Sequence, residues 1–501
     1  MPDTPFWAVC LVVVPLFFAI ICFVRSSLVT FLGPLAAWLN ALAGLGMTLS
    51  FVHSGPLRYA IGGWQAPLGI NFSIDGLSVL LVAMTAVTGL SVSMYAKGYF
   101  SLRIGSAGEI NRHGHQRAYF WPVWLLLWAA LNGLFLSADL FNIYVTLEII
   151  GLAAVVLTAL SGKPAARLAA MRYLLVSLLG SCCYLFGVAL LYRSYGILDM
   201  TALSRLVSPA PLLWVSLALL TTGLLLKTAL FPLHFWLPPA HANALAPVSA
   251  ILSGLVVKAS FYLILRLWGE VFAQVLPFAA YVLLGVLGCG AVLWGAVQAL
   301  LQKRLKMLIA YSTVAQLGYL FIALPLIRLD PGPSAREAVI LLIMAHACAK
   351  SAMFMAAGSI FLKAGHDRID DLDGIKEVLP VSSFAFVLAG VSLMGFPPSG
   401  GFLGKWLLLG VSLASGQWWW GIMLVIGSLL AAGYVYRIAC HLLVFKASFS
   451  SRRGSIPPVM EWPAVLLAVL AMILGLLAGY PLGLLEAGCP VPIHACLEVM
   501  P

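Results

Sequence analysis

The stretch LLLKTALFPLHFWLPPAH, Leu224 to His241, interrupts an otherwise apolar part of the chain. It contains a lysine, two histidines and three prolines where a membrane helix would need apolar residues. Pro232 lacks a backbone donor and collides with the preceding turn, so the helix is expected to break near Leu230. Pro238 and the proline that follows it are expected to prevent a clean restart of the helix.

Charged and titratable residues lie beside this break. Lys227 comes one turn before it and His234 just after it. Because a bilayer tolerates freed backbone carbonyls only where protein or water surrounds them, the broken helix is predicted to line a cavity near the membrane midplane. A second break is predicted in LAGVSLMGFPPSGGFLGKWLLLG, where Pro397 and Pro398 interrupt the apolar run and Lys405 follows.

The composition is that of a polytopic membrane protein. Of 501 residues, 62% are hydrophobic and only 9% are charged, which lies far from the usual range of soluble domains. The net charge of +11 comes from short clusters between apolar runs, so a lipid bilayer rather than a nucleic acid is the expected partner. With about 20 residues for each crossing, the chain is predicted to be an all-α integral membrane protein of about fourteen spans. They lie near residues 6–24, 30–52, 76–96, 119–137, 140–160, 173–192, 211–233, 246–266, 275–299, 308–327, 338–362, 380–413, 418–444 and 461–486.

Lysine and arginine residues in the loops are unevenly distributed between the two sides of the predicted membrane. One side holds seventeen: Arg25, Lys97, Arg103, Arg112, Arg117, Lys163, Arg167, Arg172, Lys303, Arg304, Lys306, Lys363, Arg368, Lys376, Lys446, Arg452 and Arg453. The other side holds six: Arg58, Arg193, Arg205, Arg266, Arg328 and Arg336. Since cytoplasmic loops are rich in these residues, both termini are expected outside the cytoplasm, with the protein in a bacterial cytoplasmic (inner) membrane.

Apart from residues at the very ends of spans, six charged side chains fall inside the predicted spans: Glu148, Lys227, Lys258, Lys350, Lys405 and Arg437. A charge at the centre of a membrane helix costs about 2.5–3.5 kcal/mol, so such residues are usually functional. The alternatives are a structural ion pair or a side chain that reaches the interface, and Arg437 is the candidate for the latter. His346 lies four residues before Lys350, so both occupy one helix face and could pass protons between them.

The two breaks differ in the order of lysine and proline. Lys227 precedes the first break, whereas Lys405 follows the second. This opposite order predicts two inverted five-helix repeats, each with a broken helix. Residues 1–118 would then hold the first three spans, 119–266 the first repeat, 275–444 the second repeat, and 461–501 the last span with an extracytoplasmic tail.

Five segments are similar to the antiporter-like subunits shared by respiratory complex I, Mrp-type cation/proton antiporters and membrane-bound hydrogenases. They are FNIYVTLEIIGL, LLLKTALFPLHFWLPPAHANALAPVSAILSGLVVKASFYLILR, QKRLKMLIAYSTVAQLGYL, AHACAKSAMFMAAGSIF and GFPPSGGFLGKWLL. The resemblance covers roughly residues 70–445 and is strongest to the D-type subunit of Mrp antiporters, with the hydrogenase-type subunits close behind. It implies a fold of fourteen helices with two inverted repeats, in a complex with other membrane subunits.

The resemblance also implies a chain of protonatable residues along the membrane midplane. Glu148 and Lys227 would form the ion pair of the first half-channel, and Lys258 would link the two halves. The remaining members would be His346, Lys350 and Lys405, the last being the terminal lysine of the second half-channel. The sequence departs from the pattern at Pro239, where many relatives have an aspartate, so any role of that carboxylate is absent here.

The predicted function is ion translocation within a multi-subunit monovalent cation/proton antiporter. The alternative is a proton-pumping subunit of a complex I-like NADH:quinone oxidoreductase or a membrane-bound hydrogenase, and a single-chain transporter is a third, weaker hypothesis. The sequence contains no GxGxxG, P-loop, HExxH or CxxC motif, so no cofactor, metal or catalytic redox site is expected on this chain. The choice among H⁺, Na⁺ and K⁺ stays open, as does a disulfide between Cys489 and Cys496.

Overall fold

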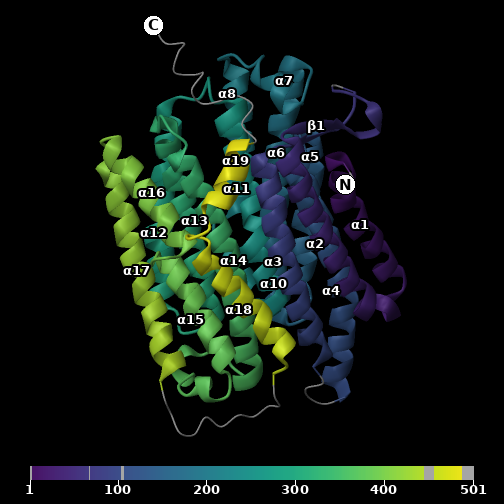
Figure 1. Ribbon diagram of the computed structural model, residues 1–501, viewed down its shortest axis with the longest axis vertical. Coiled ribbons are helices and arrows are strands. Elements are labelled where there is room, and N and C mark those ends of the chain that lie inside the picture. Colours follow the sequence, from purple (N-terminus) through teal and green to yellow (C-terminus); the bar gives the residue numbers. More distant parts are fainter. Residues whose placement is uncertain (1–2, 67, 103–106, 445–455, 488–501) are drawn as a thin grey trace.

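The computed structural model describes the chain except for residues 1–2, 67, 103–106, 445–455 and 488–501, and the side chains of 107–113. It is a bundle of long helices that run roughly along one axis (Figure 1). The helices are α1 Thr4–Val24, α2 Val29–Ser54, α3 Gly76–Ser101, α4 Ala107–Leu136, α5 Leu140–Ala159, α6 Pro164–Tyr195, α7 Met200–Ser204, α8 Pro211–Thr228, α9 Leu237–Asn243, α10 Ala246–Ile251, α11 Val257–Arg266, α12 Phe278–Leu301, α13 Leu305–Leu329, α14 Ser334–Ala364, α15 Pro380–Met394, α16 Gly400–Ala414, α17 Trp418–Leu443, α18 Pro458–Ile473 and α19 Gly479–Ala487. Cys489 and Cys496 lie outside the described residues.

The predicted all-α membrane architecture is confirmed. Twelve helices of the described chain are long and apolar enough to cross a membrane, and three shorter apolar helices accompany them. Each of the fourteen predicted spans corresponds to one helix or to consecutive shorter helices. The span predicted at 246–266, for example, consists of α10, a π-helical turn at Leu252–Val256, and α11.

Several boundaries differ from the prediction. α4 begins at Ala107 rather than 119, and α6 begins at Pro164 rather than 173, because helices continue past the apolar core into the polar interface. The last span, predicted as one helix over 461–486, is interrupted between α18 and α19. Gly475 lies in this interruption, and a Cβ there would come within 2.0 Å of the carbonyl oxygen of Pro398. The final span therefore bends where it packs against the second helix break.

A two-stranded antiparallel hairpin, which the sequence did not predict, covers the end of the bundle that also holds α7 (Figure 1). It consists of β1 Leu57–Ala60 and β2 Asn71–Ile74. Directly after β2, Asp75 caps α3 by accepting a hydrogen bond from the backbone of Ser78. Asp75 also pairs with Arg266 at 2.5 Å, which ties the start of α3 to the end of α11.

The most buried spans are Ala246–Val271, Leu305–Leu329 and Ser334–Ala364. α14 lies at the centre of the molecule, since it packs against α3, α10, α13, α15, α16 and α18. In contrast, α1, α6 and α17 carry many exposed apolar side chains that suit contact with lipid. The intramembrane lysines thus lie on or beside helices that other helices surround.

Candidate functional site

The first predicted break is a short non-helical segment between α8 and α9. α8 ends at Thr228, the next residue Ala229 has a left-handed conformation, and Pro232 lies in the turns that follow. The Nε1 of Trp236 donates to the carbonyl oxygen of Leu226 at 3.0 Å, so an indole replaces a missing backbone donor. The expectation that Pro238 prevents a restart is wrong: Pro238 lies in the first turn of α9, where a proline forfeits no helical hydrogen bond.

Glu148 and Lys227 are near the first break but do not form the direct ion pair that the resemblance implies. Lys227 Nζ donates to Ser177 Oγ at 3.2 Å and lies 3.5 Å from the Leu147 carbonyl oxygen. The Glu148 carboxylate instead accepts a hydrogen bond from Ser181 Oγ. Each of the two charged groups is thus hydrogen-bonded to a different serine of α6.

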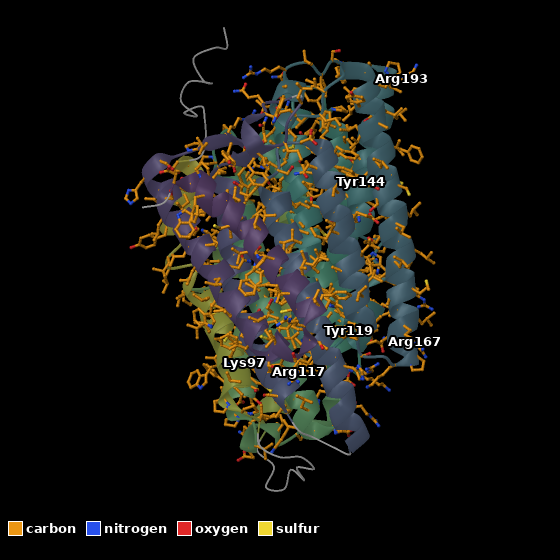
Figure 2. All side chains as sticks on the ribbon, turned by 90° about the vertical axis from the view of Figure 1, so that its right-hand side faces the viewer. Lys97, Arg117, Tyr119, Tyr144, Arg167 and Arg193 are labelled. Carbon is orange, nitrogen blue, oxygen red and sulfur yellow. The ribbon has the colours of Figure 1, made fainter. Side chains whose placement is uncertain are left out.

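These groups lie at mid-depth in the bundle. Figure 2 shows Tyr144 of α5 between Arg167, toward one end of the bundle, and Arg193, at the other end. Glu148 follows Tyr144 by one further turn of α5. Lys227 is 8% exposed. The charged pair is therefore placed in the part of the molecule that would occupy the apolar layer.

Two histidines follow in the same region. His234 lies in the break, where its ring stacks on Phe231 with 5.6 Å between centroids. His241, which the sequence analysis did not select, lies in α9 and stacks on Phe354 at 4.9 Å. It is fully buried, and neither ring nitrogen has a hydrogen-bond partner in the described protein. The signal for it was its place in the quoted stretch, just after the proline pair Pro238 and Pro239.

Lys258 is fully buried at the start of α11. Its Nζ donates to the carbonyl oxygen of Ser253, in the π-helical turn that precedes α11. Such turns often occur at functional sites because their backbone carbonyls are displaced from regular pairing. The Ser253 hydroxyl is also 2.9 Å from the hydroxyl of Thr313. Lys258 is thereby connected to α13 through one serine.

His346 and Lys350 lie four residues apart on the central helix α14, and both are buried. Lys350 Nζ donates to Ser312 Oγ and, at 3.1 Å, to the carbonyl oxygen of Ile309. Neither ring nitrogen of His346 has a hydrogen-bond partner in the described protein. An imidazole that is buried without a protein partner is suited to exchange protons with water.

Lys405 belongs to the second break, where Pro397 and Pro398 lie between α15 and α16. Its Nζ donates to the carbonyl oxygens of Leu393 at 2.9 Å and Met394 at 3.1 Å. These carbonyls end α15, so the ammonium group satisfies acceptors that the break has freed and lies at the negative end of the helix dipole.

α13 provides polar partners to the central and second-half lysines, a feature that the sequence analysis missed. Ser312 accepts from Lys350, and Thr313 contacts the serine beside Lys258. Gln316 Nε2 donates at 3.1 Å to the Leu393 carbonyl oxygen that Lys405 also contacts. Ser312 and Gln316 are four residues apart in an apolar segment, which was the available signal. No hydrogen bond between described residues connects Lys227 to Lys258.

Arg437 does not simply reach toward the interface, as the sequence analysis considered. Its Nη1 donates to the carbonyl oxygens of Leu300 at 2.6 Å and Gln302 at 3.0 Å. These acceptors lie at the end of α12, whose last carbonyls have no partner within the helix. Arg437 therefore fastens α17 to the end of α12.

Known proteins share this architecture. The family described as "NADH:quinone oxidoreductase/Mrp antiporter, TM" matches residues 137–431, more than half of the chain. The N subunit of an NADH-quinone oxidoreductase, from Desulforudis audaxviator, is 35% identical over 437 residues, which cover 85% of this chain and 84% of that protein. The D subunit of the Na(+)/H(+) antiporter from Bacillus subtilis is 26% identical over 452 residues and 87% of each chain.

The fold likeness extends over nearly the whole molecule. A chain in the structure of the Mrp complex from Dietzia sp. superposes with a TM-score of 0.84 and covers 96% of both chains at 24% identity. The helices, the two breaks and the family match together identify an antiporter-like membrane subunit of Mrp or complex I type. The chain belongs to the NADH:quinone oxidoreductase/Mrp antiporter family of transmembrane subunits.

Proposed function

We propose that this chain translocates protons across a bacterial cytoplasmic membrane as one subunit of a hetero-oligomeric complex. The observation that carries the proposal is the set of buried titratable groups at and between the two helix breaks. Lys227, Lys258, Lys350 and Lys405 each donate to a hydroxyl or backbone carbonyl oxygen, and none forms a salt bridge with a described carboxylate. These lysines donate to neutral acceptors. Loss of a proton from such a lysine therefore leaves no buried carboxylate without a positive partner.

In the proposed mechanism each half of the molecule provides one protonatable station. Glu148 and Lys227, with His234 beside the break, form the station of the first half, and Lys405 forms that of the second. Lys258, His346 and Lys350 form the connection. No hydrogen bond between described residues connects Lys227 to Lys258. In this mechanism, water molecules complete the proton path between them, since water commonly binds buried polar groups that have no protein partner.

The first candidate for the parent complex is a multi-subunit cation/proton antiporter in which this chain is the D-type member. The likeness to the Dietzia Mrp complex and to the D subunit from Bacillus subtilis supports it. Na⁺ or K⁺ would then be exchanged for protons, and the other membrane subunits would be its partners.

A redox-driven proton pump is the second candidate, because the relative that is 35% identical carries the name of an NADH-quinone oxidoreductase subunit. In that case the electron-transfer site would lie on other subunits, and this chain would contribute only the membrane pathway. A complex I-like or hydrogenase-type parent would make the pumping depend on NADH or hydrogen oxidation.

The test is a pH-gradient assay in inverted membrane vesicles that contain the complete complex. Lys227→Ala and Glu148→Ala should abolish proton movement at unchanged subunit levels, and Glu148→Asp should retain part of it. The matched control is Lys97→Ala, since Lys97 is exposed at the end of α3 (Figure 2). Full activity of Lys227→Ala would refute the proposal. Dependence of the signal on Na⁺ or K⁺, rather than on NADH or hydrogen, distinguishes the two parent complexes.

A further inference from the structure

The structure places the hydroxyls of Ser177 and Ser181 against the two charges of the first half. We propose that these serines are positioning residues that hold Lys227 and Glu148 apart, and that Gly151 leaves the space for the Ser177 hydroxyl. This inference rests on the proposed function, because it assigns the groups that set the geometry of the Glu148–Lys227 station.

The chemistry of the contacts fits this role. A hydroxyl can both donate and accept, so one residue type serves charges of opposite sign. Ser181 donates to the Glu148 carboxylate, and Ser177 accepts from the Lys227 ammonium at 3.2 Å. Both serines are buried and lie one turn apart on the same face of α6. α6 packs against α5 and α8, the helices that hold Glu148 and Lys227.

Gly151 supports the arrangement from α5. A Cβ at this position would lie 2.4 Å from Ser177 Oγ, but 3.5 Å from Lys227 Nζ and 3.6 Å from Ser177 Cβ. The hydroxyl oxygen is thus the only one of these three atoms that a methyl group would displace. Any larger residue at 151 must move the Ser177 hydroxyl from its place beside the lysine.

The serines affect the step at which the charges separate. An ion pair that opens in an apolar environment normally leaves two unpaired charges, which is strongly unfavourable. Here each charge keeps a hydrogen bond when the pair is open. The separated arrangement becomes accessible, and the lysine can exchange its proton while the carboxylate stays solvated by Ser181.

The experiment measures initial rates of proton movement in inverted vesicles that contain the complete complex at matched subunit levels. Ser177→Ala and Ser181→Ala should each lower the rate about tenfold, since hydrogen bonds to charged groups are the stronger ones. Ser194→Ala is the control on the same helix, because Ser194 is exposed and its hydroxyl only donates to the carbonyl oxygen of Leu190. It should leave the rate unchanged.

Two further comparisons separate the hydroxyl from general packing. Gly151→Ala should lower the rate as much as Ser177→Ala. The double variant should be no slower than Ser177→Ala alone, because it lacks the Ser177 hydroxyl that the methyl group introduced by Gly151→Ala would displace. Ser181→Thr should retain most of the rate, whereas Ser181→Val, which has nearly the same shape, should not.

Each comparison also has an outcome that would overturn the inference. Multiplying losses in the Gly151/Ser177 double variant would show that the glycine acts through packing. Equal rates for the threonine and valine variants would show that the Ser181 hydroxyl is not needed. Wild-type rates in all the serine variants, with Lys227→Ala inactive in the same vesicles, would refute this inference and leave the proposed function standing. Full activity of Lys227→Ala would refute both.

Discussion

At the scale of single residues, the molecule surrounds each membrane lysine with neutral acceptors instead of counter-ions. Lys405 is the clearest case. Its Nζ donates to the two carbonyl oxygens that end α15 and lies 4.4 Å from the centroid of the Tyr319 ring. Backbone carbonyls and a ring face stabilise the ammonium ion, yet none of them holds it as strongly as a carboxylate would. In the proposed function, this weaker hold allows the lysine to lose its proton.

Gly395 provides the tightest test of this geometry. It adopts a left-handed conformation with φ of +84°, and a Cβ there would lie 3.0 Å from Lys405 Cδ and 3.4 Å from Nζ. Gly395→Ala should therefore strain the end of α15 and push the lysine from its acceptors. We expect at least a tenfold loss of proton movement in vesicles. Gly416→Ala, which also has positive φ but open space around it, is the control for backbone strain alone, and an equal loss there would contradict the proposed role.

The sequence did not reveal which serine hydroxyls contact the charged residues. Serine and threonine in apolar helices commonly donate to a carbonyl of their own helix, as Thr85 does to Leu81 and Ser194 does to Leu190. Ser177 and Ser181 have the same kind of sequence surroundings, but they contact groups on other helices. Only the packing of α6 against α5 and α8 separates the two cases, so sequence spacing alone could not.

At the scale of elements, the two breaks were predictable from their prolines. Pro232, Pro397 and Pro398 lie in non-helical segments between helices, where the missing backbone donor costs no helical hydrogen bond. Proline alone does not decide the outcome, since Pro325 lies inside the continuous helix α13. The hairpin and α7 were not predictable from the hydropathy pattern, since they lie outside the apolar spans. We propose α8–α9 and α15–α16 as the corresponding broken helices of two inverted repeats, each with its lysine beside the break.

The hairpin end contains an ion pair whose effect depends on pH. Burial alone would raise the pKa of Asp75, but the charge of Arg266 and the hydrogen bonds from Arg266 and Ser78 outweigh it and lower the pKa. The pair therefore stabilises the fold fully above the ordinary aspartate pKa of about 4, and this contribution is lost as pH falls through the lowered native value.

Asp75→Asn tests this connection between α3 and α11. At pH 7 the free energy of unfolding of the variant should be about 3 kcal/mol lower, because the buried Arg266 charge loses the Asp75 carboxylate. At pH 3 the difference from the wild type should shrink. Thermal unfolding in detergent at both pH values measures this. Arg266 also pairs with Glu270 at 2.7 Å, and Glu270→Gln should cost less because that carboxylate is 53% exposed. A pH-independent difference for Asp75→Asn would mean that the side chain acts only as a helix cap.

At the scale of the whole molecule, the described chain has charges of the predicted cytoplasmic group at one end and of the opposite group at the other. Figure 2 shows Lys97, Arg117 and Arg167 toward one end of the bundle and Arg193 at the other. The beginning of α1 and the last described helix, α19, both extend toward the end with α7 and the hairpin (Figure 1). The arrangement of the helices shows which loops share one end of the bundle. The positive-inside rule then predicts which of the two ends of the bundle faces the cytoplasm.

The direction can be tested on the two ends of α6. A reporter that is active only in the cytoplasm should work when fused after Gly162, in the turn before α6, and one active only outside should work after Gly196, which follows α6. Because the positive residues of the predicted cytoplasmic loops outnumber those of the opposite loops nearly threefold, we expect this pattern, with an external reporter also active at the C-terminus. The reverse pattern would place the loops that are rich in lysine and arginine outside the cytoplasm, and it would exchange the two sides of the membrane for the whole of the proton path proposed above.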